Sequence, residues 1–266
     1  MWNNAAGAVL GDGKFQVGAS YTMWNVSAES ANAPGPYNIA AVAGYGRVAK
    51  FMTVSAGVRY FGGNPYDIVD DATGVISGTF TPVNLQAGIG LGFRILPMFS
   101  LGANVSYVHS VLSQNGKAGA VSVDFGALLD LKFMRVGVTA SNIGSGLDYG
   151  AGPNELPANL KIGVGTEQRF GNDDKHALSV NLEGGLLFNQ TSFFAGVGAQ
   201  YAWNDMLRVS AGYHYGDQAT QFYGSYASVG IGVKVIGILF NAAYLIGTDK
   251  DSPLTNTFSL GLGFAF

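Results

Sequence analysis

The residue types that most often carry out chemistry in proteins are sparse in this chain. The three histidines, His109, His176 and His214, are scattered along the sequence and lack the spacing of a metal site. Asp70-Asp71 could bind a divalent cation, but a solvated loop tip is the favoured interpretation of this pair. We therefore predict that the chain has no metal site.

A glycine-rich stretch, Gly88-Ile89-Gly90-Leu91-Gly92, superficially resembles a nucleotide-binding loop. It lies in the middle of an expected strand and no helix follows it, whereas a phosphate-binding loop needs a helix N-terminus behind it. Small residues that ease packing inside a sheet explain the glycines better. No Ser, His and Asp arrangement has a supporting context, which disfavours barrel phospholipases and proteases. We predict no catalytic residue and no cofactor, and hence a protein that is not an enzyme.

The composition points away from an ordinary soluble domain. Of 266 residues, 12% are charged and 40 are glycine, against about 25% and about 7% in soluble domains. The 13 Tyr and 17 Phe are too many for a disordered segment. No uninterrupted run of about 18 apolar residues is available for a transmembrane helix. The net charge of −3 gives no indication of a nucleic-acid partner.

Apolar and small polar residues alternate along most of the chain, as in strands that bury one face. Fourteen segments show this pattern, each long enough to supply the roughly 9–11 residues that cross a bilayer at a tilt. They lie near residues 14–26, 38–49, 51–62, 81–95, 98–111, 118–131, 133–143, 157–170, 176–188, 193–203, 206–216, 223–234, 235–247 and 255–266.

The connections between these segments alternate between very short turns and generally longer loops, of which 63–80 is the longest. Outer-membrane barrels have short periplasmic turns and longer external loops, and a sheet in hydrocarbon must close on itself. The sequence therefore predicts an all-β fold, a transmembrane antiparallel β-barrel formed by residues 1–266 as one domain. We expect a multi-pass protein of the Gram-negative outer membrane, in contact with its lipid, with both termini periplasmic. Residues 1–13 are a candidate periplasmic or plug segment.

The charges of the strands fall out of phase with the apolar residues, so we expect them to face the lumen and to pair across it. They are Arg59, Arg94, Asp124, Asp130, Arg135, Lys161, Glu183, Arg208 and Lys234. A soluble β-sandwich is the rival structure, but its polar face would be rich in Lys, Glu and Thr. Here that face is mostly Gly, Ser, Ala and Asn, which suits a crowded barrel interior better.

The C-terminal residues Leu262, Phe264 and Phe266 share one face of the last segment. They resemble the terminal-strand signal that outer-membrane assembly machinery recognises. An interfacial aromatic residue at the end of any barrel strand is the alternative explanation. We favour the assembly signal.

With this strand number, the chain resembles the FadL superfamily of fourteen-stranded barrels, and within it the PorV/PorQ group. Three stretches carry the resemblance. Trp2-Asn3-Asn4-Ala5-Ala6-Gly7 is similar to the Asn-Pro-Ala-Gly-Leu segment at the start of these proteins, with Asn4-Ala5 where Asn-Pro is usual. The others are a mid-barrel pattern at 138–144 with 155–163, and a late hairpin at 198–201 with 207–213. The resemblance makes Asn4, Ala5 and Gly7 candidate plug residues.

The PorV/PorQ resemblance implies a non-enzymatic accessory or shuttle subunit in type IX protein secretion or in another outer-membrane complex. Its partners would be other outer-membrane or periplasmic proteins. The alternative is a FadL-type channel for long-chain fatty acids or other hydrophobic molecules, which enter from outside, pass a plug and leave sideways into the membrane. The chemistry of the lumen must decide between them, because a fold supports many functions.

Overall fold

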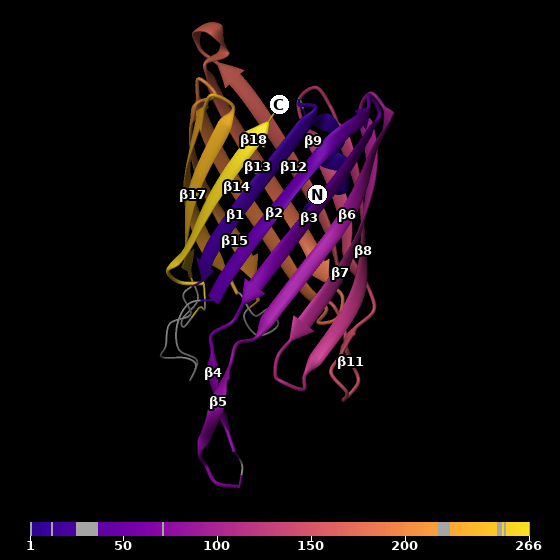
Figure 1. The fold of residues 1–266 in the computed structure, drawn as a ribbon. Helices are drawn as coiled ribbons and strands as arrows, with labels where there is room; N and C mark the ends of the chain where they lie inside the picture. Colours follow the sequence, from indigo (N-terminus) through magenta and orange to yellow (C-terminus); the bar gives the residue numbers. More distant parts are fainter. Residues whose placement is uncertain are drawn as a thin grey trace.

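The computed structural model describes residues 2–11, 13–24, 37–70, 72–217, 224–248, 252 and 254–265. Within these residues, fourteen antiparallel strands close into a barrel in the order β1-β2-β3-β6-β7-β8-β9-β12-β13-β14-β15-β16-β17-β18, and β18 pairs with β1 (Figure 1). The predicted fold class and strand number are confirmed. The strands are β1 Phe15–Trp24, β2 Tyr37–Ala49, β3 Met52–Gly62, β6 Val83–Leu96, β7 Phe99–Val111, β8 Lys117–Asp130, β9 Arg135–Gly144, β12 Asn159–Phe170, β13 His176–Leu187, β14 Ser192–Trp203, β15 Leu207–Gly216, β16 Tyr226–Val235, β17 Ile238–Gly247 and β18 Thr257–Ala265.

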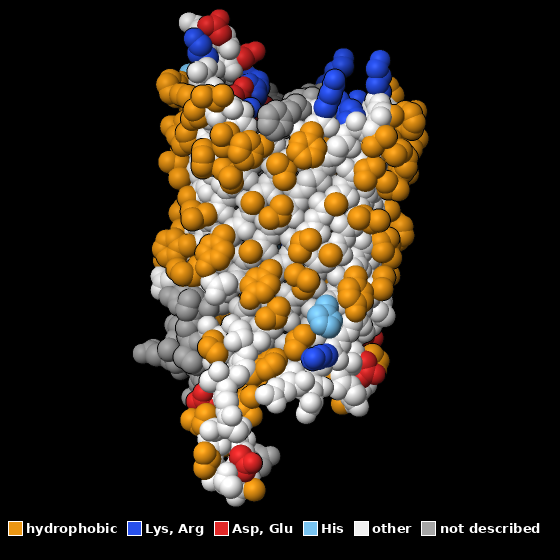
Figure 2. Space-filling view, viewed as in Figure 1, with side chains coloured by type: hydrophobic (Ala, Val, Ile, Leu, Met, Phe, Trp, Pro, Cys, Tyr) orange, Lys and Arg blue, Asp and Glu red, His pale blue; other side chains and the backbone are white. Residues whose placement is uncertain are grey.

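The alternation of the sequence becomes the two faces of the barrel wall. Ile89, at the middle of β6, is 68% exposed on the outer face, and Leu260 of β18 is 59% exposed. Over the visible face, hydrophobic side chains cover the middle, whereas Lys, Arg, Asp and Glu gather at the two ends (Figure 2). An apolar band between charged ends is the surface that a bilayer requires, because hydrocarbon solvates no charge.

Two short hairpins lie outside the barrel wall. β4 (Tyr66–Val69) pairs with β5 (Ile76–Phe80), and this hairpin projects well beyond one end of the barrel (Figure 1). The sequence predicted only a loop here. At its tip the Asp70 carboxylate accepts hydrogen bonds from the Ala72 and Thr73 backbone N–H groups, which agrees with a loop tip. Asp71 lies outside the described residues. The second hairpin joins β10 (Leu147–Asp148) to β11 (Pro153–Asn154).

The end of the barrel opposite these hairpins carries the short turns. Gln16 of β1 pairs with Ala265 of β18, so the first and last strands meet at that rim. The β14–β15 turn places Asn204 and Asp205 at φ 54° and 53°, the left-handed pair that a two-residue hairpin turn needs. A short 3-10 helix, η2 (Asn172–Asp174), occupies the predicted turn near 171–175. No helix among the described residues is long and apolar enough to cross a membrane.

Candidate functional site

A 3-10 helix near the N-terminus, η1 (Ala5–Leu10), packs against the inner wall formed by β3, β6, β7 and β8. Ala5, Ala6 and Val9 are buried in this contact. The helix fits because glycines face it. A Cβ at Gly102 would lie 2.3 Å from the Ala6 nitrogen, and a Cβ at Gly126 would lie 2.1 Å from Asn4 Oδ1. We call residues 2–11 the plug, and these glycines with Gly92 the glycine groove.

Asn4 caps the plug helix and ties it to the wall at the same time. Its Oδ1 accepts a hydrogen bond from the Ala6 backbone N–H at 2.9 Å, and its Nδ2 donates to the Ala127 carbonyl at 3.1 Å. An N-cap side chain of this kind contributes about 1 kcal/mol to a helix. Asn4 and Ala5 thus lie on the wall, whereas a Cβ at Gly7 would meet nothing within 4 Å.

Two arginines of the wall hold the far end of the plug. Arg94 donates to the Val9 carbonyl at 3.0 Å, and Arg47 donates to the Gly11 carbonyl. These carbonyls lie at and beyond the C-terminal end of the helix, where cations are favoured. The Tyr45 hydroxyl lies beside Gly11. Tyr45 therefore faces the plug and not the outer surface, in the same strand phase as Arg47.

The start of the plug contacts the charged middle of the lumen. The Arg59 guanidinium lies 4.3 Å from the centre of the Trp2 ring, a cation–π contact. The two residues, with Asp124, line a small cavity of about 150 Å³. Asp124 accepts hydrogen bonds from Asn104 Nδ2 at 2.9 Å and from the Asn142 backbone N–H at 2.8 Å. Asn142 has φ 58° at a bulge between β8 and β9, and the Asp124 carboxylate stabilises this conformation.

The plug covers one wall of the lumen and leaves the other side open. A cavity of about 1180 Å³ extends along β9, β12, β13, β14, β15 and β16. It begins at the Asp130–Arg135 turn on the short-turn rim and reaches His214 and Tyr226 near the opposite end. Small and polar side chains line most of it, including Gly198, Gln200 and Ser210. The arrangement is that of a lumen that is half filled and half open.

The inner wall carries more positive than negative charge. Among the described barrel strands, eight cations and four anions lie at inward-facing positions, the same positions that line the cavity or contact the plug. They are Arg47, Arg59, Arg94, Arg135, Lys161, Arg169, Arg208 and Lys234, against Asp124, Asp130, Glu167 and Glu183. Some are paired: Lys161 Nζ lies 3.4 Å from Glu183, and Arg135 Nε lies 2.9 Å from Asp130.

Aromatic side chains gather on the inner wall near the hairpin end. The His214 ring stacks on Tyr226 at 4.9 Å and on Phe194 at 5.9 Å between ring centres. These residues come from three neighbouring strands and we call them the aromatic row. A second group, Trp24 with Tyr37 and Phe61, forms on β1, β2 and β3. His214 and Tyr226 line the open cavity, whereas Trp24 is 4% exposed, so the second group is largely packed.

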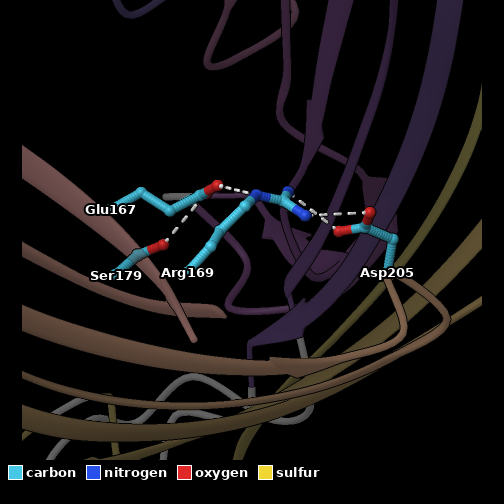
Figure 3. Close-up of polar contacts among 4 residues, drawn as sticks. All are labelled: Glu167, Arg169, Ser179 and Asp205. Carbon is cyan, nitrogen blue, oxygen red and sulfur yellow. Dashed lines mark hydrogen bonds and ion pairs between the residues drawn. The ribbon is translucent and has the colours of Figure 1, made fainter. Parts of the chain in front are cut away.

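At the short-turn rim, a polar network joins three parts of the chain (Figure 3). Arg169 of β12 donates two hydrogen bonds to the Asp205 carboxylate, at 3.1 and 3.2 Å, and one to Glu167 at 3.0 Å. Ser179 of β13 donates to Glu167. The bidentate contact fixes the β14–β15 turn beside the rim of the open cavity.

We expect this network to weaken in acid. The hydrogen bonds from Arg169 lower the pKa of Asp205 from its ordinary value. A carboxyl whose folded pKa is lowered stabilises the fold above its unfolded pKa, and that contribution is lost as the pH falls through the folded value. Asp205→Asn should therefore cost less than about 1 kcal/mol at neutral pH, because the pair is exposed, and should remove part of the acid sensitivity. Unfolding in urea at a series of pH values measures this. Arg169→Gln should cost at least as much, because it also loses the contact with Glu167. A double variant that loses much more than Arg169→Gln alone would contradict the pairing.

The remaining predicted residues lie apart from the lumen. Leu262 and Phe264 are on the outer face of β18, beside β1 and β17, and Phe266 lies outside the described residues, so the assembly signal stays a prediction. His176 Nδ1 lies 2.6 Å from the Tyr201 hydroxyl near the short-turn rim. Within the part of the chain that the structure describes, no group of three metal-ligating side chains occurs.

Comparison with known proteins places this architecture among solved outer-membrane channels. The sequence matches no family model and no curated protein sequence. Similar structures include the Ralstonia pickettii toluene transporter TbuX, at 15% identity and a TM-score of 0.66, covering 100% of this chain and 92% of that one. The P. putida toluene transporter TodX has 14% identity and a TM-score of 0.67, with 99% and 93% covered. A Pseudomonas aeruginosa FadL homologue has 12% identity and a TM-score of 0.55, and the match covers 100% of this chain and 93% of that one.

The fold is that of the FadL-like barrels. At these identities the likeness concerns the fold alone. It agrees with the fourteen-stranded fold that the superfamily resemblance implied, and it gives no support to the narrower PorV/PorQ assignment.

Sequence reasoning missed three features of this site. The glycine groove was seen only as small residues inside a strand, and the aromatic row and the rim network were not seen at all. Each depends on which residues of different strands lie side by side, for example His214 opposite Tyr226. The sequence indicated that Phe194 and Glu167 each face inward, but it could not show which residues of other strands lie beside them.

Proposed function

We propose that this protein is a non-enzymatic channel of the Gram-negative outer membrane that admits small, largely hydrophobic molecules. The outward apolar band contacts lipid, and both termini lie on the periplasmic side, where short turns are usual for such barrels. The permeant enters at the hairpin end, contacts the aromatic groups and passes beside the plug. This is the FadL-type alternative of the sequence interpretation.

One observation carries the proposal: the plug occupies a single wall and leaves a continuous cavity of about 1180 Å³ along the other. Ligand pockets for small molecules span roughly 300–1,000 Å³, so this cavity is large enough for a small molecule and its solvent. The similar structures include toluene transporters and a monoaromatic hydrocarbon channel. They support transport of a hydrophobic molecule.

The secretion role implied by PorV/PorQ is the second candidate. None of the similar structures named above is described as a secretion component. One feature favours a protein partner: the projecting β4–β5 hairpin exposes Val69, Val75 and Ile76. An exposed apolar hairpin can bind another protein. We rank this role below the channel because it leaves the open cavity without a purpose.

Filling the cavity should stop transport. In the Gly198→Phe variant the new ring would project into the open cavity, where the nearest atom to a Cβ is the Ala211 carbonyl oxygen at 3.8 Å. We expect uptake of radiolabelled toluene by cells expressing this variant to fall several-fold below uptake with the parent chain. Outer-membrane amounts are to be matched by immunoblot.

The matched control is Gly46→Phe, which adds the same ring on the outward-facing side of β2, where a Cβ meets nothing within 4 Å. It should leave uptake unchanged. Equal uptake by cells with Gly198→Phe, with the parent chain and with no barrel would refute the channel. In that case, recovery of secretion subunits with the purified protein would favour the second candidate.

A further inference from the structure

The charge of the inner wall restricts which molecules the proposed channel prefers. Cations outnumber anions there by two to one among the described barrel strands, although the whole chain has a net charge of −3. The lining of the open cavity itself is balanced, with Lys132, Arg135 and Lys161 against Asp130, Glu167 and Glu183, so the excess lies on the wall around it. A net positive wall favours anions, because the low-dielectric wall focuses the field of its fixed charges into the water-filled space.

Two of these cations lack a close carboxylate partner among the described residues. Arg208 of β15 and Lys234 of β16 lie on neighbouring strands, with Gly232 directly opposite Arg208 and Lys234 one pleat further along. Neither forms an ion pair with a described residue, and Arg208 Nε is buried without a hydrogen-bond partner in the same set. The nearby Asp205 carboxylate is hydrogen-bonded to Arg169. The hydrogen bonds from Arg169 and the charges of Arg208 and Lys234 lower its pKa, so this one carboxylate offsets only part of the positive charge.

The position of this pair matters. Ser210, one pleat from Arg208, lines the open cavity, and so does Ser228 on β16. The pair therefore lies next to the cavity near the short-turn rim, while the aromatic row lies toward the other end. A molecule that crosses meets aromatic surface first and then these two cations.

From these observations we propose that the open half of the lumen conducts small aromatic anions in preference to cationic molecules of the same size. An aromatic ring finds edge and face contacts at His214 and Tyr226. Its carboxylate or sulfonate is drawn toward Arg208 and Lys234, which offer charge-assisted hydrogen bonds. This inference rests on the proposed channel function and specifies its substrate class.

The test compares two probes of similar size and opposite charge. Proteoliposomes that contain the full chain are given radiolabelled benzenesulfonate or benzyltrimethylammonium, neither of which crosses lipid readily. We expect the sulfonate to enter several-fold faster than the ammonium ion. The double variant Arg208→Gln with Lys234→Gln should bring the two rates together. Lys117→Gln, at the outward-facing start of β8, removes a cation elsewhere and should leave the ratio unchanged.

Equal entry of the two probes, faster entry of the ammonium ion, or entry of neither above protein-free liposomes would overturn the inference. If any of these results were found while toluene uptake in cells still depended on the open cavity, only the anion preference would be lost and the channel function would stand. If neither sulfonate entry nor toluene uptake depended on the protein, both the anion preference and the channel function would be refuted. Because salt screens fixed charges, the preference for the sulfonate should also shrink as the ionic strength rises. A preference that does not change with salt would contradict an electrostatic origin.

Discussion

Gly102→Val is expected to lift the plug off the wall and expose residues that are buried in the parent protein. A Cβ at this position would lie 2.3 Å from the Ala6 nitrogen and 2.5 Å from the Ala5 carbonyl carbon, both backbone atoms that cannot rotate away. Overpacking of this kind costs about 1–3 kcal/mol, and each 1.4 kcal/mol is about a tenfold change in an equilibrium. The plug should therefore be displaced in a much larger fraction of molecules.

The chain has no cysteine, so a single introduced thiol reports on the plug without interference. Val9 is almost completely buried against the wall, and Val9→Cys should react slowly with a maleimide. Adding Gly102→Val should speed that reaction many-fold and raise conductance in planar bilayers. Gly198→Val, on the open wall, is the control and should do neither. Slow labelling in a folded Gly102→Val barrel would mean that the glycine groove does not hold the plug.

The strands could be predicted because the information that defines them is local. The alternation of Phe258, Leu260 and Leu262 with Ser and Gly specifies a strand and its outer face without reference to any other part of the chain. The closed barrel then follows, since a sheet in lipid cannot leave an edge. The β4–β5 hairpin escaped prediction because its strands, Tyr66–Val69 and Ile76–Phe80, are too short to show a clear alternation.

The site could not be predicted to the same extent because it is made by register between strands. Gly92, Gly102 and Gly126 form one groove only because β6, β7 and β8 align them, with Gly92 opposite Gly102 and Gly102 opposite Gly126. A shift by one residue would put side chains of the other face there.

Arginine on the outer face at mid-height should cause the largest loss of stability. Ile89 lies at the middle of β6, opposite Val105 of β7, and points away from the lumen. If this face contacts hydrocarbon, Ile89→Arg costs about 2–4 kcal/mol, because the guanidinium loses its hydration there. Gln200→Arg introduces the same charge into the open cavity, where water remains, and should cost far less. Urea unfolding in lipid vesicles, followed by heat-modifiable migration on gels, compares the two variants. Equal stability of both would mean that the outer band does not contact lipid, and the membrane-spanning arrangement on which the channel depends would fail with it.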